Sequence, residues 1–302
     1  MKFPRPASRG RLRYALAGGL ALIATGLVAG CDSRVGIEGT DYRADEPQAP
    51  VASSTSASPT TAAATAAAAP ALPKPKPGEL AVTVSLTKRD SAAADALTRW
   101  AMDLQSVSPA RLQAKCWTVA PQNVQSMYTD KNAILSALAR PGVDDGTAIT
   151  WQGAGRGAVT VVAQRTDIDT GYACPRVFQA GTTPTFNDAD ARHTVRRYLD
   201  RVTGTPLAAA DKESTHPLRC AATPGTWDPT GTGRATTPPL AAEPGKVDDV
   251  QSFVDRSLTS AALRGPYLTV SASVLTTDGV EQTRTFTLKS GKQGYCIGDV
   301  SS

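Results

Sequence analysis

The sequence predicts an α+β protein with two similar domains, residues 79–182 and 183–302, each a helix packed on an antiparallel sheet with one disulfide. Two stretches repeat apolar residues with helical spacing, and later segments alternate apolar and polar residues as strands do. Four cysteines are shared equally between the two regions. A helical pattern followed by strand patterns in each region is typical of α+β layers.

The first 30 residues have the pattern of a signal peptide. The basic side chains at its start are Lys2, Arg5, Arg9, Arg11 and Arg13. An uncharged, mostly apolar run follows from Tyr14 to Ala29, and no acidic residue precedes it. Crossing a bilayer takes about 20 apolar residues, so this run is shorter than a transmembrane anchor. We therefore expect residues 1–30 to direct export.

Cys31 directly follows the sequence Leu-Val-Ala-Gly at residues 27–30. The order Val-Ala-Gly-Cys resembles the lipobox of bacterial lipoproteins, and the Ala-, Thr-, Gly- and Arg-rich composition resembles that of actinobacterial proteins. The resemblance implies lipidation of Cys31 with a diacylglyceryl thioether and removal of the preceding peptide. Acyl chains such as palmitate would then hold the protein on the extracytoplasmic face of the cell membrane. A plain cleaved signal that ends at a cysteine is the alternative.

Residues 31–78 are predicted to form a disordered linker rich in Ala, Ser, Thr and Pro. The stretch from Val51 to Pro73 contains no charged side chain and shows no apolar period. Such a segment buries too little surface to offset the entropy of ordering it. As a flexible coil, about 45 residues reach roughly 35–40 Å, which would hold the folded part away from the membrane.

The charge balance argues against nucleic acid as a partner. The formal net charge of the whole chain is +5, and residues 1–30 carry five basic and no acidic side chains. The rest of the chain is therefore close to neutral, and lacks the positive excess that phosphate binding needs. One dense basic run remains, and a solvated helix face accounts for it: Arg192, His193, Arg196 and Arg197.

Four stretches have helical patterns. The apolar stripe of the first is Leu97, Trp100, Ala101 and Leu104, and that of the second is Ala191, Val195, Tyr198, Leu199 and Val202. Asp130 is placed to cap a third helix over residues 131–139, which stops before Pro141. A fourth helix is marked by Val250, Phe253, Val254 and Leu258, with Asp248 and Asp249 at its N-terminus and Gly265-Pro266 at its end.

The four cysteines after Cys31 predict two disulfides in an exported protein, with three possible pairings. They are Cys116, Cys174, Cys220 and Cys296. Each region has one cysteine after its long helix and one near its end, in Tyr-Ala-Cys or Tyr-Cys. This repeated order favours pairing within each region, Cys116 with Cys174 and Cys220 with Cys296.

The clearest predicted hairpin lies between residues 267 and 288. A three-residue loop, Thr277 to Gly279, sets Val270 opposite Phe286 and puts the alternating apolar residues of both strands on one face. A two-residue loop would place the apolar sets on opposite faces, so we expect the longer loop with Gly279 left-handed.

A similar hairpin is expected in the first region. Strand residues 159–163 would lead through a turn at Asp167–Gly171 to Tyr172 and Cys174. Residues 153–158, Gly-Ala-Gly-Arg-Gly-Ala, fit a loose dinucleotide fingerprint, but strand-forming residues follow where a helix is needed, so we expect a β turn. Residues 221–245 are rich in Pro, Gly and Thr and predict a long surface loop.

A long helix followed by an antiparallel sheet, repeated along the chain, resembles tandem cystatin-like or NTF2-like domains. Such domains occur in exported proteins, including components of conjugation and secretion channels. The resemblance covers about residues 79–302 and implies a helix packed across each sheet.

No catalytic constellation, cofactor motif or metal-ligand spacing stands out. The chain has two histidines, His193 and His216, and no Gly-x-Ser-x-Gly motif, so we expect neither histidine to be catalytic. Asp167–Gly171 begins like a calcium loop but lacks its later oxygen ligands and terminal Glu. We therefore predict no enzyme and no cofactor.

The leading interpretation is a lipid-anchored, non-enzymatic envelope protein that binds another envelope protein in a secretion, conjugation or cell-wall complex. The alternative is a carrier that encloses a lipid or small apolar ligand between helix and sheet. Its candidate lining residues are Trp100, Trp117, Trp151 and Tyr198.

Overall fold

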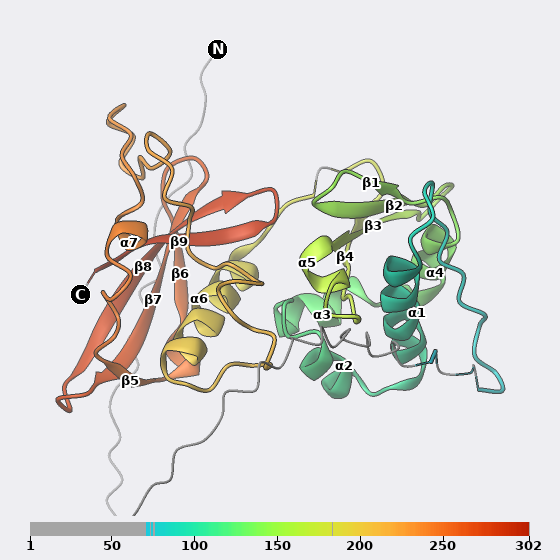
Figure 1. The fold of residues 1–302 in the computed structure, drawn as a ribbon, viewed down its shortest axis with the longest axis horizontal. Coiled ribbons are helices and arrows are strands. Elements are labelled where there is room, and N and C mark those ends of the chain that lie inside the picture. Colours follow the sequence, from blue (N-terminus) through green and yellow to red (C-terminus); the bar gives the residue numbers. More distant parts are fainter. Residues whose placement is uncertain (1–70, 73, 75, 183, 302) are drawn as a thin grey trace, which may run out of the picture. The chain divides into compact units, whose positions relative to one another are not determined.

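The computed structural model describes residues 71–72, 74, 76–182 and 184–301 (Figure 1). The signal peptide, Cys31 and most of the linker lie outside the described residues and stay predictions. The described residues belong to one compact unit that runs from Ala67 to Ser302. We refer to residues 79–182 as the first half and to residues 183–302 as the second half.

The first half begins with a helical layer. Its helices are α1 (Ser91–Ser106), α2 (Pro109–Lys115), α3 (Pro121–Met127) and α4 (Lys131–Leu138). The side chains of Asp90, Ser108 and Asp130 accept hydrogen bonds from the first turns of α1, α2 and α4, as N-caps do. The helix predicted to follow Asp130 is thereby confirmed.

A four-stranded antiparallel sheet completes the first half, in the order β1–β2–β3–β4. Its strands are β1 (Val143–Asp144), β2 (Ala148–Gln152), β3 (Val159–Gln164) and β4 (Arg176–Gln179), with the short helix α5 (Arg165–Ile168) after β3. The glycine-rich residues 153–158 connect β2 to β3, as predicted. Trp100 and Trp151 are completely buried in the core between helices and sheet.

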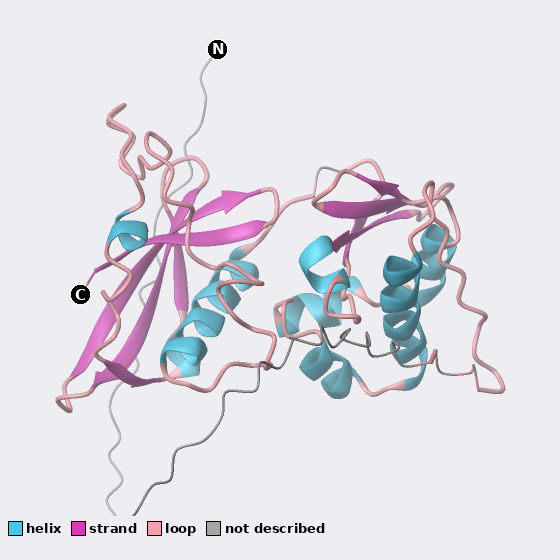
Figure 2. Cartoon of the chain, viewed as in Figure 1, coloured by secondary structure: helices cyan, strands magenta, loops and turns pink. Residues whose placement is uncertain are grey.

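The second half consists of a long helix on a five-stranded antiparallel sheet (Figure 2). The helix is α6 (Asp188–Val202), and a short helix, α7 (Pro239–Ala242), follows it. The strands are β5 (Val250–Phe253), β6 (Thr259–Ala262), β7 (Tyr267–Thr276), β8 (Glu281–Gly291) and β9 (Gly294–Ser301). Val195 and Leu199 of α6 are completely buried in one core with Phe286.

The predicted β7–β8 hairpin is confirmed in register. Val270 pairs with Phe286 and Leu268 with Leu288. The Thr276 amide donates to the Val280 carbonyl, which leaves three residues in the loop, and Gly279 has φ of 83°. Burying one face of each strand fixed this register.

The helix predicted from Val250 to Gly265-Pro266 is wrong. This segment forms β5, a 3₁₀ turn at Asp255–Ser257, and β6. Pairing with β7 uses its backbone groups, so tertiary contacts override the helical spacing of its apolar residues. Asp248 and Asp249 consequently precede a strand.

The hairpin predicted in the first half is right only in part. β3 and β4 are antiparallel neighbours. However, Asp167 lies in α5, and Tyr172 and Cys174 lie in the connection before β4, outside any strand. Both halves mix helices with an antiparallel sheet, but the first has a layer of helices where the second has one long helix. Their mutual similarity therefore stays a prediction.

Residues 221–245 form the expected long loop, interrupted by α7 and by an isolated bridge between Trp227 and Thr236. Trp227 is only 4% exposed and packs over Gly298 of β9, where a Cβ atom would lie 2.2 Å from its ring. The completely buried Leu240 of α7 and the Thr226 carbonyl, which accepts from Tyr267 Oη and Lys289 Nζ, also hold the loop against the sheet.

Candidate functional site

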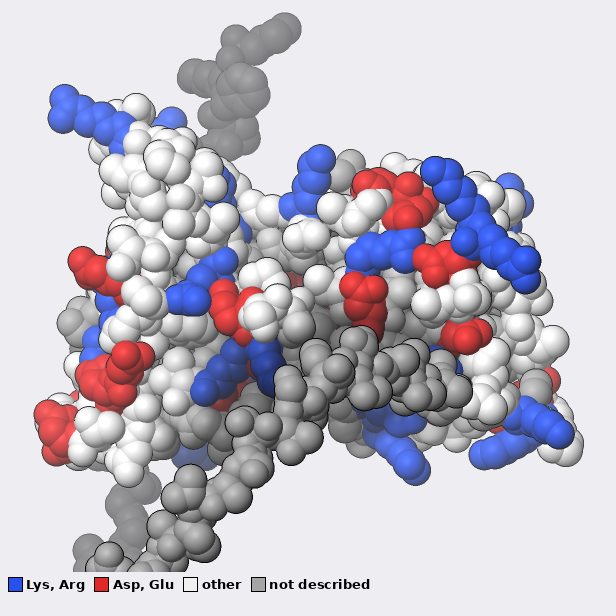
Figure 3. Space-filling view, in the orientation of Figure 1, with Lys and Arg blue, Asp and Glu red and all other residues white. Residues whose placement is uncertain are grey.

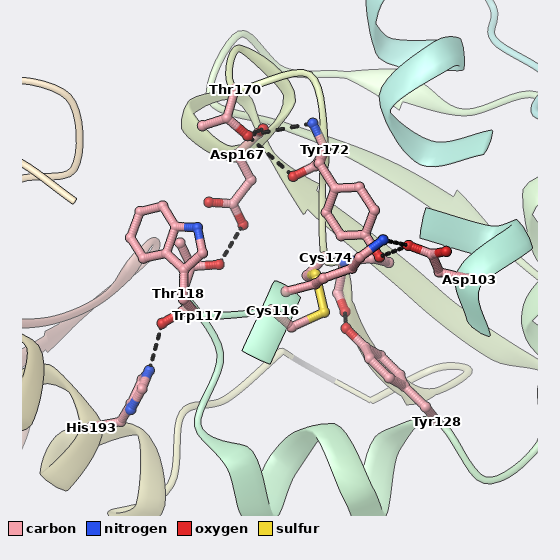
Figure 4. The surroundings of a disulfide bond; sticks show 12 residues. Asp103, Cys116, Trp117, Thr118, Tyr128, Asp167, Thr170, Tyr172, Cys174 and His193 are labelled. Atoms are coloured by element: carbon pink, nitrogen blue, oxygen red, sulfur yellow. Dashed lines mark hydrogen bonds and ion pairs between the residues drawn. A yellow bond between two sulfur atoms is a disulfide. The ribbon is translucent and has the colours of Figure 1, made fainter. Parts of the chain in front are cut away.

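The two disulfides pair as the order of the chain favoured. Cys116 joins Cys174, which connects the end of α2 to the segment before β4 (Figure 4). Cys220 joins Cys296 of β9. Beside the first disulfide, the buried Tyr128 hydroxyl donates to the Pro175 carbonyl at 2.7 Å. The burial raises the pKa of Tyr128, so its hydroxyl stays protonated and keeps this bond.

A buried polar group lies directly after Cys116, between the first half and α6. We call it the junction cluster; its members are Trp117, Asp167, His193, Arg197, Asp211 and His216. They surround or adjoin a cavity of about 120 Å³. Because this cluster holds most of the buried titratable side chains, it is the first place to look for chemistry.

Asp167 and His216 form a pair in this cluster. The Thr118 hydroxyl donates to Asp167 Oδ2 at 3.0 Å, and His216 Nε2 lies 3.5 Å from Asp167 Oδ1. The edge of the Trp117 ring system meets the His216 ring with centroids 4.8 Å apart. Both ionisable side chains are nearly buried, and the contacts join the first half to the second.

Arg197 and Asp211 form the second pair. Arg197 Nη2 donates to Asp211 Oδ1 at 2.7 Å, and its guanidinium lies 4.9 Å from the centre of the Trp117 ring. Arg201 also binds Asp211, whose side chain is 0% exposed. Burial alone would raise the pKa of Asp211, but the two guanidiniums outweigh it and lower the pKa. Asp211 is therefore a fully paired carboxylate.

His193 is the last member and is neutral at pH 7. Its Nε2–H donates to the Trp117 carbonyl at 2.8 Å (Figure 4). Burial lowers the pKa of His193 to about 4, because the charged ring would lose its hydration. The bond attaches α6 to the first half.

The basic run on α6 was predicted to be a solvated face, and this prediction is wrong for two of its four residues. His193 and Arg197 are 6% and 7% exposed and face the junction cluster. Arg192 and Arg196 remain partly exposed on another side of the helix. Partners far along the chain decide this division, so the local sequence could not reveal it.

The contacts of the junction cluster connect the first half to the second and suit a structural role. Its carboxylates are paired with basic groups or a hydroxyl, and its histidines contact Trp117. No group of three His, Cys, Asp or Glu side chains within the described residues could hold a metal ion. Asp167 and His216 are 49 positions apart, and no motif in the sequence signals their pairing.

The aromatic residues proposed to line a ligand pocket lie in packed surroundings. Trp100 and Trp151 are 0% exposed in the first core, and Tyr198 packs edge-on against Phe286 in the second. Trp117 belongs to the junction cluster. Three of these four residues therefore contribute to core packing.

An open strand edge is a second candidate site. β5 and β6 pair with β7 on the side opposite β8, so β6 is an edge strand. The Leu263 amide donates to the Tyr267 carbonyl, and by alternation Thr259 and Ala261 also bond to β7. The backbone groups of Ser260 and Ala262 therefore point to the open side.

The β6 edge is short, but it carries none of the charges or prolines that usually shield an edge strand. Its four residues, Thr-Ser-Ala-Ala, include no charge and no proline, and Ala261 and Ala262 are exposed. Natural proteins usually shield such edges with charges, prolines or a covering segment. Over the face shown in Figure 3, basic and acidic side chains are interspersed, and no single sign dominates it.

The search for similar proteins returned nothing: no family model, no curated protein and no solved structure matches the chain. Among the described helices, none combines the length and the apolar character needed to cross a membrane.

Proposed function

We propose that this protein is a lipid-anchored, non-enzymatic module of the cell envelope that binds another protein by adding one of its strands to β6. The open β6 edge is the observation that carries the proposal. An extended segment can bond to the outward N–H and C=O groups of Ser260 and Ala262, which is how β-augmentation gives affinity.

Two further features support a binding role. The junction cluster and two disulfides hold the described residues together, so the β6 edge belongs to a crosslinked and well-packed fold. Rigid presentation lowers the entropy that binding must overcome. The sequence adds the lipidation signal at Cys31 and the linker, which would let the module search the space near the membrane.

A photo-crosslinking amino acid at the exposed Thr259 tests this function in intact cells. We expect adducts of one or a few discrete masses that contain another protein. Adding Ala262→Pro should abolish them, because proline removes an outward N–H without breaking a bond to β7. The same crosslinker at Thr277, in the exposed β7–β8 loop, is the position control.

The proposal is wrong if Thr259 gives no protein adduct, or if adduct yield is unchanged by Ala262→Pro in a protein that keeps its thermal unfolding temperature. Native mass spectrometry of the purified protein distinguishes this proposal from the carrier alternative. Only a carrier is expected to retain a lipid or small molecule.

A further inference from the structure

A groove of about 310 Å³ lies at the start of β6. Residues that line it include Pro121, Arg192, Arg196, Asp255, Arg256 and Leu258. Three of these side chains are guanidiniums and one is a carboxylate.

The charges of the groove are incompletely neutralised. Arg192 donates to two neutral groups, Ser260 Oγ at 2.8 Å and Gln122 Oε1 at 3.5 Å. Arg256 is exposed and forms no ion pair with any described residue.

Arg196 is the one groove arginine with acidic partners. Its Nε lies 3.3 Å from Asp255 Oδ1 and 3.8 Å from Asp200 Oδ2. Burial raises the pKa of Asp200 to about 6, so this carboxyl is still mostly ionised at pH 7. Three guanidiniums face two carboxylates, Asp255 and Asp200, so the groove keeps a net positive charge at neutral pH.

The groove is continuous with the open strand edge. Leu258, in its wall, directly precedes Thr259 of β6, and Arg192 holds the side chain of Ser260. A segment that pairs with Ser260 and Ala262 would extend into the groove. Its carboxylates would meet guanidiniums that can bind them in a two-point fork, and the stems of its side chains would meet Leu258 and Pro121.

We propose that the groove selects the partner by charge: the segment that adds to β6 is acidic where it reaches Arg192 and Arg256. This inference rests on the proposed function and adds the chemical class of the partner. Charge complementarity favours an acidic segment over the other two kinds. A basic segment would be repelled by the arginines, and a neutral one would leave their guanidiniums without carboxylates.

The test uses full-length protein in detergent and two dye-labelled synthetic peptides. Both alternate Thr and Val over four residues; one ends in three glutamates and the other in three glutamines. Fluorescence anisotropy should show the glutamate peptide binding at least tenfold more tightly. Arg192→Gln with Arg256→Gln should remove this preference.

Arg111→Gln with Arg140→Gln is the matched control, because it removes the same charge from exposed positions of the first half. It should change affinity less than twofold. Equal binding of both peptides, no binding of either, or an unchanged preference in the groove variant would overturn the inference. Displacement of the glutamate peptide by phosphate, but not by equal acetate, would also overturn it by identifying a phosphate site.

These outcomes are distinct from failure of the proposed function. Adducts at Thr259 that are lost with Ala262→Pro but persist in the groove variant would leave protein binding intact and reject only the acidic partner.

Discussion

Replacing Cys116 and Cys174 with alanine should lower the free energy of unfolding by about 4 kcal/mol, because the disulfide closes a loop with a separation of 58 residues. In the chain-entropy model, the crosslink acts mainly by restricting the unfolded chain. Domains are stable by roughly 5–15 kcal/mol, so this loss is a large part of the total. The disulfide also fixes the start of the segment that carries Trp117 into the junction cluster.

Urea unfolding followed by circular dichroism measures this loss. Cys220→Ala with Cys296→Ala, which opens a separation of 76 residues, should have an effect of similar size. Cys31→Ala is the control, since it lies outside both loops and should leave the unfolding midpoint unchanged. A loss below about 1 kcal/mol for both disulfide variants would show that neither crosslink stabilises the fold as argued.

Asp211→Asn should destabilise the protein by about 3–5 kcal/mol, because it leaves the buried Arg197 without a carboxylate and Arg201 with Glu213 alone. Arg197 and Arg201 both bind Asp211, and their side chains are only 8% and 12% exposed. Asparagine keeps the shape of the side chain and removes its charge, so the effect reports electrostatic pairing.

Thermal and urea unfolding of this variant should be compared with Asp169→Asn, which removes a charge at an exposed position. The control should lie within about 0.5 kcal/mol of the unmodified protein. Equal stability of the two variants would show that the pairing of Asp211 with Arg197 and Arg201 contributes little to the stability of the second half.

Patterns within short stretches of sequence were enough to predict four features of the fold. The apolar stripes that begin at Leu97 and Ala191 predicted α1 and α6, and Asp130 predicted the start of α4. The apolar alternation around Val270 predicted the register of the β7–β8 hairpin. The pairing of the cysteines followed from the repeated order of elements.

The rest depended on contacts between distant residues. The apolar residues from Val250 to Leu258 have helical spacing, and only pairing with β7 makes the segment from Val250 to Ala262 two strands. The partners of His193 and Arg197 lie at Trp117 and Asp211, so their burial has no local signal. The helical spacing of this segment predicts no strand, so it gives no sign of the β6 edge or of the arginine groove beside it.

The central claim is that a fatty modification at Cys31 displays this module at the membrane. Metabolic labelling of cells with a clickable palmitate, followed by gel detection, tests it most directly. Our account predicts a labelled wild-type band and no label on Cys31→Ala at equal protein level. Equal labelling of the two proteins, or no labelling of either, would contradict it.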